Sequence, residues 1–489
     1  RDRAGGNAVD AAIAAALVAI NTEPGVCSLG CGGYITIWKP GQTAVTLDGY
    51  VAAPGLDGDP ATARNSTEVH LDYGGGVTTI VGPDSIGVPG GVALLGHASH
   101  RYGQLPWREL FEPVIGLVRE GFPLPQASYQ YLVFSGEPIF SRASDGRAAL
   151  FDEAGVLRDA GAAIRVPHLA DTLEQIALKG PQEFYTGDLG RSIADFVIDN
   201  GGRLGRRDMA AFEVIERPSL LIPCDNWQIA TNPPPAIGGT TLGAMLQLMS
   251  ASAEADGQTM NLARLIEIQT AVLGYRRGRL DLSDDIERDA ARLLDQAQAD
   301  DLRGILQSGS TCHTSAVDSD GLACAVTLSA GYGAGDMPPG TGIWLNNCLG
   351  ELELNRRGLD IGPPGTRLPS NMAPCAARDD RGTVMAIGSP GADRITTALL
   401  QTLINHIHGG MPLEAAIEHP RAHVEFIEDQ PRVAYEAGLD FAALEIARRE
   451  FAAHSMFFGG VAAACWNPDC GFTAAADSRR SGGTWQPED

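Results

Sequence analysis

The hydrophobic pattern at the start of the chain predicts a buried helix followed by a strand. From Ala8 to Ile20 the residues are apolar with one exception, Asp10, and Asn7 stands where a helix N-cap is expected. Pro24 disfavours helical geometry at the preceding residue, so we expect the helix to end near that point. After a glycine-rich loop, the alternation of side chains from Tyr34 to Trp38 predicts a strand.

The middle of the chain, from about Asp84 to Asp300, has mainly helical spacing. Segments with apolar residues three and four positions apart are separated by Gly and Pro turns, and the clearest of them are 92–99, 110–119 and 189–198. We expect Asn232–Pro235 and Gly238–Thr241 to form a rigid loop that leads into a helix over Leu242–Met249. No internal repeat and no low-complexity linker interrupts this region.

Strand patterns return abruptly at Thr311. The small residues of Gln307–Ser310 precede it, and period-two alternation then runs from Thr311 to Val317. The turn residues Asp318–Gly321 and a second apolar run, Leu322–Ser329, complete a predicted β-hairpin. Thr311 and His313 share one face of this hairpin.

Composition narrows the class of protein. The 489 residues are 44% hydrophobic and 20% charged, as in a folded soluble protein, and the formal charge is -24. Such a charge repels phosphate backbones and anionic membrane surfaces, so nucleic acid is excluded as a partner. No apolar run reaches the roughly 20 residues of a membrane span. The sequence lacks an initiator Met, which leaves a signal peptide, and with it the compartment, open.

Nine cysteines, an odd number, are scattered without a CxxC pair and without histidines at zinc spacing. We interpret them mostly as buried thiols, with local disulfides at Cys27/Cys31 and Cys465/Cys470 as the alternative. We expect no metal and no cofactor. The signatures GxSxG, HExxH, GxxxxGK[ST] and GxGxxG are all absent.

Several ordered motifs instead resemble the gamma-glutamyltransferase family of N-terminal-nucleophile hydrolases. The likeness spans nearly the whole chain, in the segments Gly5–Ala12, Gly32–Gly33, Gly87–Gly90, Phe184–Gly187, Gly342–Asn347, Met372–Pro374 and Gly388–Ile395, together with the strand that begins at Thr311. The resemblance implies an α/β (α+β) fold, a four-layer αββα sandwich. It also implies self-cleavage between Ser310 and Thr311 into a large subunit, 1–310, and a small subunit, 311–489, intertwined in one domain.

The resemblance also implies catalytic roles. Thr311 would be the nucleophile, and its own α-amine, with an ordinary pKa of roughly 8, would accept the hydroxyl proton. Ser329 would orient Thr311. The backbone amides of Gly391 and Ala392 would stabilise the oxyanion, with Ala392 at a position that is usually a second glycine. Read alone, His313 is a satisfied strand histidine, and this mechanism needs no histidine.

The substrate-binding positions depart from the family pattern. Ser370 and Asn371 match a pair of substrate-contacting serines. The arginine that holds the γ-glutamyl α-carboxylate in the family is replaced by Tyr50, and the α-amino contacts fall on Cys348 and Glu351. Gly331 replaces an asparagine. Loss of a bidentate arginine costs a carboxylate-bearing substrate about 2 to 5 kcal/mol, although an arginine elsewhere, such as Arg394, could replace the contact.

The leading hypothesis is therefore a self-processing amidohydrolase or acyltransferase acting on a small amide or short peptide through an altered pocket. The alternative within enzymes is a true γ-glutamyl transferase or glutathione hydrolase with a different carboxylate anchor. A third hypothesis is an unprocessed, inactive binding protein. The sequence leaves the acyl donor, the choice between water and amine acceptors, and the oligomeric state open, a homo-oligomer included.

Overall fold

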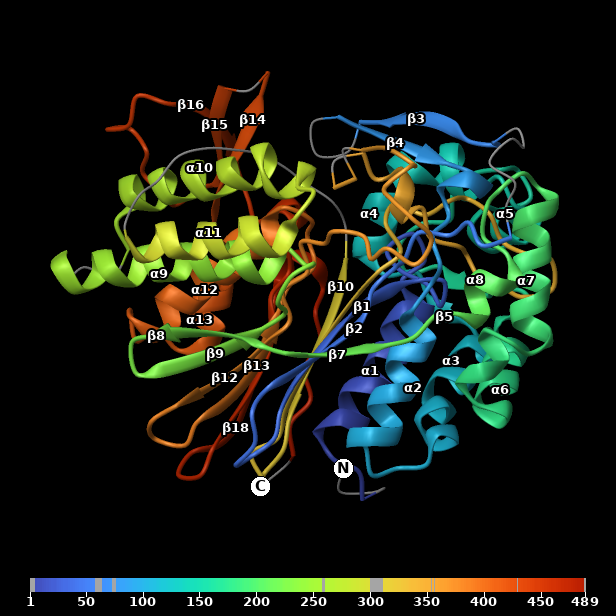
Figure 1. The fold of residues 1–489 in the computed structure, drawn as a ribbon, viewed down its shortest axis with the longest axis horizontal. Helices are drawn as coiled ribbons and strands as arrows, with labels where there is room; N and C mark the ends of the chain where they lie inside the picture. Colours follow the sequence, from blue (N-terminus) through green and yellow to red (C-terminus); the bar gives the residue numbers. More distant parts are fainter. Residues whose placement is uncertain are drawn as a thin grey trace.

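Two β-sheets lie face to face and helices cover their outer faces (Figure 1). The structure is a computed structural model that describes residues 5–57, 64–72, 76–256, 260–299, 311–352, 354–355, 357–428 and 430–487. The layers follow one another as helix, sheet, sheet and helix, so the predicted four-layer αββα sandwich is confirmed.

The first sheet combines strands from before and after residue 311. Its five strands are antiparallel, in the order β10 (Cys312–Val317), β11 (Ala323–Ser329), β1 (Gly32–Trp38), β2 (Val45–Gly49) and β7 (Ile215–Pro218). The predicted hairpin is β10 and β11, which begins one residue after Thr311.

The second sheet also combines strands from before and after residue 311. Its antiparallel order is β18 (Gly471–Ala476), β17 (Ala462–Asn467), β13 (Val384–Gly388), β12 (Cys375–Asp379), β9 (Trp227–Thr231) and β8 (Leu220–Cys224). Three small sheets lie outside the sandwich: β3 (Thr67–Leu71) with β4 (Val77–Val81), β5 (Phe122–Pro123) with β6 (Ala163–Ile164), and β14 (Ala422–Ile427), β15 (Gln430–Glu436) and β16 (Ala447–Phe451).

The helices form the two outer layers. On the side of the first sheet, α1 and α2 contact its strands and the others pack beyond them: α1 (Ala8–Thr22), α2 (Gly91–Tyr102), α3 (Glu112–Glu120), α4 (Gln126–Ser135), α5 (Ser144–Leu150), α6 (Leu169–Lys179), α7 (Asp188–Asp199) and α8 (Arg206–Ala210). The side of the second sheet carries α9 (Gly238–Asp256), α10 (Leu262–Gly278), α11 (Ile286–Gln298), α12 (Arg394–Ile407) and α13 (Leu413–Glu418).

The first helix is built as the sequence predicts. The Asn7 side chain accepts hydrogen bonds from the amides of Val9 (2.9 Å) and Asp10 (3.2 Å), and the Asp10 carboxylate accepts one from the Asn7 amide (2.9 Å). This reciprocal capping satisfies amides that would otherwise lack a partner. Asn7 also donates to the carbonyl of Tyr102 at the end of α2 (2.7 Å), which joins the two helices.

Two expectations for the middle of the chain are wrong. Gly238–Thr241 is the first turn of α9, not a loop, because these glycines allow close packing: a Cβ on Gly238 would lie 2.2 Å from the carbonyl oxygen of Asn371. The strands β7, β8 and β9 also interrupt a region predicted to be mainly helical. Pro218 and Pro223 obscured them, yet both lie in edge strands, where a missing N–H is tolerated.

Replacing the N-cap residue of α1 should destabilise the fold more than replacing an N-cap residue that makes no hydrogen bond to a second helix. We expect Asn7→Ala to lower the free energy of unfolding by about 1 to 2 kcal/mol, because it removes both the cap and the bond to Tyr102. The matched control is Asn261→Ala, since Asn261 caps α10 through the amides of Ala263 and Arg264. Thermal unfolding measures both; an equal loss would contradict a role for the Tyr102 bond.

Candidate active site

Thr311 and Ser329 lie side by side at one end of the first sheet. Cys312 pairs with Leu328, so the next residues outward, Thr311 and Ser329, stand opposite each other, and Ser329 pairs on its other side with Gly32. Thr311 and Ser329 are each 3% exposed. The Ser329 hydroxyl accepts a hydrogen bond from the amide of Gly331 (3.1 Å). Ser310 lies outside the described residues, so the cleavage bond stays a prediction.

The turn with the expected oxyanion donors follows β13 in the second sheet. Gly391 has φ +124° and Ala392 has φ +69°, so both adopt backbone conformations that L side chains rarely take. Gly391 packs against the backbone of Gly459, since an added Cβ would lie 2.5 Å from its Cα. Ala392 tolerates the left-handed conformation with its small side chain, at a cost of order 1 kcal/mol.

His313 connects this turn to the predicted nucleophile, Thr311. Its ring packs on Gly388, the last residue of β13, where an added Cβ would lie 2.1 Å from the imidazole Cε1. Thr311 is two residues before His313 and Gly391 is three residues after Gly388. The predicted nucleophile and oxyanion donors therefore lie at neighbouring ends of two facing strands, β10 and β13.

The environment of His313 agrees with its interpretation as a structural residue. Its Nδ1 and Nε2 are hydrogen-bonded to the hydroxyls of Thr327 (2.8 Å) and Ser315 (2.7 Å). Burial lowers the pKa of His313 to about 3. The ring is therefore neutral at physiological pH, and both of its nitrogens are already used.

The three residues predicted to replace the γ-glutamyl contacts do form one cluster. The Tyr50 hydroxyl and the Cys348 thiol hydrogen-bond to each other, and Glu351 lies beside Cys348. Burial is the main cause that raises the pKa of Tyr50 and of Cys348, and Glu351 raises both further, whereas the hydrogen bond with Tyr50 lowers the pKa of Cys348. Tyr50 also stacks on Tyr34 with ring centroids 5.7 Å apart. Each of these side chains is at most 2% exposed.

Gly331 allows this cluster to approach the predicted nucleophile. An added Cβ on Gly331 would lie 3.0 Å from the carboxylate carbon of Glu351. Gly331 also donates its amide to the Ser329 hydroxyl, so this hydroxyl, which is expected to orient Thr311, and the Glu351 carboxylate both lie next to Gly331. A larger residue at this position would collide first with Asn347 Oδ1, 2.4 Å from the added Cβ, and then with Glu351.

Ser370 and Asn371 are held from two sides. The Ser370 hydroxyl accepts from the amide of Met372 (3.2 Å), and its carbonyl accepts from the amides at the start of α9. The Asn371 amide group donates to the carboxylate of Asp393 (2.8 Å). Since Asp393 directly follows Ala392, one of the two predicted substrate residues is bonded to the predicted oxyanion turn.

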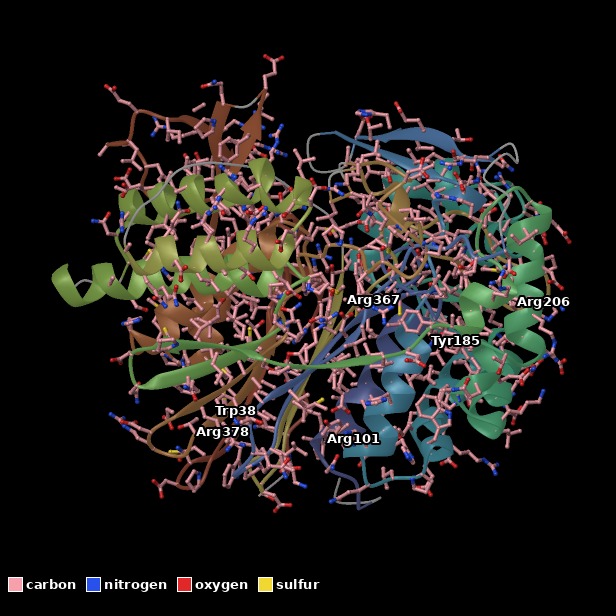
Figure 2. The ribbon with its side chains drawn as sticks, in the orientation of Figure 1. Trp38, Arg101, Tyr185, Arg206, Arg367 and Arg378 are labelled. Carbon is pink, nitrogen blue, oxygen red and sulfur yellow. The ribbon has the colours of Figure 1, made fainter. Side chains whose placement is uncertain are left out.

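Arginines lie near Tyr50 but are bound by other groups. Arg217 and Arg367 both pair with Asp48, with N to O distances of 2.9 Å and 3.5 Å. Arg367 stacks over the Phe212 ring at 4.2 Å, near the middle of the molecule (Figure 2). Arg394, the arginine suggested by the sequence, donates to the Phe457 carbonyl (2.9 Å) and stacks on the Phe457 ring.

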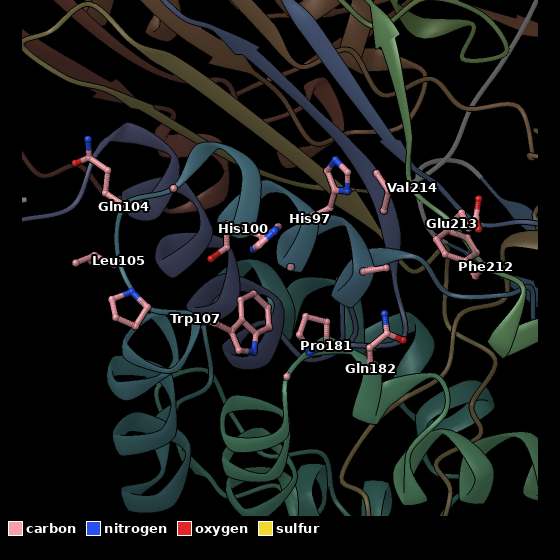
Figure 3. Close-up of a pocket in the computed structure, with 16 residues that line it drawn as sticks. His97, His100, Gln104, Leu105, Trp107, Pro181, Gln182, Phe212, Glu213 and Val214 are labelled. Atoms are coloured by element: carbon pink, nitrogen blue, oxygen red, sulfur yellow. The ribbon is translucent and has the colours of Figure 1, made fainter.

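Among the cavities formed by the described residues, three open at the surface without Thr311 in their lining. One of about 940 Å³ lies beside α2 and is lined by His97, His100 and Trp107 (Figure 3). A second, of about 590 Å³, runs between β10 and the strands β17 and β18 and reaches His313. A third, of about 510 Å³, is lined by Arg217, Arg367 and other charged residues.

Within the described ranges, no three His, Cys, Asp or Glu side chains gather closely enough to hold a metal ion. In the same residues no helix combines the length and apolarity needed to cross a bilayer. The nine cysteines are free thiols, eight of them buried and Cys470 exposed.

Comparison with known proteins identifies the family. A family model described as Gamma-glutamyltranspeptidase matches residues 3–486. The chain belongs to the gamma-glutamyltranspeptidase family. The resemblance read from the motifs is thereby confirmed.

Members with different names are similar to this chain. A glutathione hydrolase proenzyme of Pseudomonas aeruginosa is 31% identical over 468 residues, which cover 87% of this chain and 80% of that protein. The Acylase ACY 1 proenzyme of Pseudomonas sp. (strain V22) is 28% identical, covering 98% and 89%. The crystal structure of cephalosporin acylase from Bacillus halodurans covers 99% of this chain and 93% of its own with TM-score 0.78; at 21% identity it shows the fold alone.

Sequence reasoning missed charged residues around this family site. Glu23, interpreted only as a helix end, is half-buried near Cys312, and burial raises its pKa to about 7 although Arg480 opposes the shift. The Arg480 Nη2 lies 3.8 Å from a Cβ added to Gly391. Asp393 and its partner Arg276 were also missed. No local pattern marks any of them, because each reaches the site from a distant part of the chain.

Lowering the pH should remove stability through His313. An unfolded imidazole binds its proton near pH 6.5, but the folded His313 does so only near 3, so the unfolded chain binds more protons between these values. The contribution of neutral His313 is present above pH 6.5 and is lost as the pH falls. We expect the midpoint temperature of His313→Gln to fall less than that of the wild type between pH 7.5 and pH 5. The control Thr314→Ala should keep the wild-type slope; an unchanged slope in His313→Gln contradicts the assignment.

Proposed function

We propose that this chain is a self-processing amidohydrolase or acyltransferase that attacks an amide through Thr311, with a pocket altered from the γ-glutamyl type. The observation that carries the proposal is the arrangement of Thr311 beside Ser329 and across from the strained turn of Gly391 and Ala392. Family membership adds that relatives across this length are named as proenzymes.

The chemistry needs only groups of this chain. In the precursor, the Thr311 hydroxyl attacks the carbonyl of Ser310, and the peptide C–N bond breaks as the ester forms, which releases the α-amine of Thr311. Water then hydrolyses this ester and frees the Thr311 hydroxyl and the carboxylate of Ser310. In the mature enzyme this amine takes the proton of the hydroxyl while Oγ attacks the substrate amide. The amides of Gly391 and Ala392 donate to the oxyanion. The amine of the substrate leaves with a proton, and water or an acceptor amine then releases the acyl group from Thr311.

The replaced substrate contacts support an altered pocket. A γ-glutamyl carboxylate would meet Tyr50 where a bidentate arginine is expected, and the hydroxyl of Tyr50 is already bonded to Cys348. Two relatives in the family are named acylases. We therefore propose that the substrate is a small-molecule amide or a short peptide whose acyl group differs from γ-glutamyl.

Glutathione hydrolysis remains the second candidate function. Glu351 keeps one carboxylate for an α-amino group, and the two arginines on Asp48 form a cationic group near Tyr34. An unprocessed binding protein is the candidate of another class, and processing itself tests it.

Removing the nucleophile should stop both cleavage and catalysis. We expect the wild type to separate in denaturing electrophoresis into chains of 310 and 179 residues, the smaller one beginning with Thr311 by N-terminal sequencing. Thr311→Ala should remain one chain of 489 residues without activity. The control is Thr314→Ala, which should be cut normally. Thr314 lies on the strand that follows Thr311, and its hydroxyl donates a hydrogen bond to the carbonyl of Ala12 in α1. Cleavage of Thr311→Ala would show that the predicted cleavage bond is wrong. A wild type that stays uncut would support the hypothesis of a binding protein.

The two enzyme hypotheses differ in γ-glutamyl turnover. Without the arginine clamp we expect γ-glutamyl p-nitroanilide to be hydrolysed with kcat/KM at least about 30-fold below that of ordinary family members, in line with a loss of about 2 to 5 kcal/mol. Release of p-nitroaniline at 405 nm is the measurement, with a glutathione hydrolase assayed in parallel. Equal turnover would favour the glutathione hydrolase.

A further inference from the structure

A buried chain of charges ends beside the predicted oxyanion turn. Arg276, on α10, lies between Asp281 of the short helix Leu280–Leu282 and Asp393; its Nε donates to Asp281 over 3.1 Å, and its Nη1 donates to Asp393. All three are at most 5% exposed. Two carboxylates share one guanidinium here, so these three residues carry a net negative charge.

This chain fixes the orientation of Asn371. Its amide group contacts Asp393 over 2.8 Å, and an ion-paired carboxylate can only accept hydrogen bonds. The NH₂ of Asn371 must therefore face Asp393, and its carbonyl oxygen Oδ1 must point elsewhere. Residue 371 thus presents an acceptor, where the matching serine of the family has a hydroxyl that can donate.

Two acceptor atoms at this place have no hydrogen-bond partner among the residues that the structure describes. They are Oδ1 of Asn371 and Oδ2 of Asp393, on side chains 3% and 1% exposed. A buried acceptor without a donor is costly, and a bound group that donates to it recovers that cost. A carboxylate has no hydrogen to donate to either acceptor.

We propose that the acyl pocket selects a substrate group that donates hydrogen bonds, a carboxamide or an amine, at residue 371, which matches a substrate-contacting serine of the family. Asp393 acts as a positioning residue that holds Asn371 with its oxygen toward the substrate. This inference rests on the proposed function and gives the substrate class of the same site.

Two matched p-nitroanilides test the preference. The 4-carbamoylbutanoyl and glutaryl compounds have nearly the same shape, but the first ends in an NH₂ donor and the second in a carboxylate. We expect the processed wild type to hydrolyse the carboxamide with a kcat/KM at least about tenfold higher, because a site of buried acceptors rejects a group that cannot donate. The ratio of the two values on one preparation does not depend on the fraction of folded enzyme.

Two variants test the role of the amide. Asn371→Ser restores a hydroxyl that can donate, and Asp393→Asn frees Asn371 to turn; each should shift the ratio toward the carboxylate by at least about tenfold. Asp84→Asn is the matched control, because Asp84 is a fully buried carboxylate paired with Arg203 (2.6 Å) outside this site, and it should leave the ratio unchanged.

A wild type that prefers glutaryl, that hydrolyses neither compound, or whose ratio stays unchanged in both Asn371→Ser and Asp393→Asn would overturn the inference. Acylation of Thr311 by p-nitrophenyl acetate, read by peptide mass spectrometry, separates this failure from that of the proposed function. If Thr311 is acylated without the expected preference, only the substrate class is wrong. If Thr311 is not acylated, the proposed function itself fails.

Discussion

The contact between His313 and Gly388 fixes the distance between the two sheets at the site. The imidazole of one sheet lies on the bare Cα of the other, and only a glycine leaves room for it. Thr311 belongs to the first sheet and the turn of Gly391 and Ala392 to the second, so their relation depends on how the two sheets stack. A neutral ring with both nitrogens bonded gives this contact one orientation.

Local signals in the sequence predicted the elements that hold Thr311, the proposed nucleophile. The Asn7 cap, the strand after Tyr34 and the hairpin after Thr311 follow from capping and period-two alternation, and all three are present. The edge strands with Pro218 and Pro223 escaped prediction because proline usually opposes strands, and the start of α9 escaped because glycines usually mark turns. In both cases the position in the fold decided the outcome.

Some residues of the candidate site could likewise be predicted from the sequence and others could not. Motifs in the sequence identified Thr311, Ser329 and the Gly391 turn as candidates, and the structure brings these together without testing their roles. The charged residues that surround them could not be predicted. Arg276 is more than one hundred residues from Asp393 along the chain, and only the packing of α10 against the second half of the molecule joins the two.

The replaced residues of the acyl pocket form a consistent set. If Tyr50 alone had replaced the arginine, the neighbouring positions would still be suited to a carboxylate. Instead Tyr50 is bonded to Cys348, and Asn371 has its donor bound by Asp393, while Glu351 adds a carboxylate near Gly331. In the proposed pocket, a γ-glutamyl carboxylate would therefore meet hydrogen-bond acceptors at several positions at once. The same positions suit a group that donates hydrogen bonds, so the substrate class that we propose requires a pocket changed in polarity and not a pocket that has lost its function.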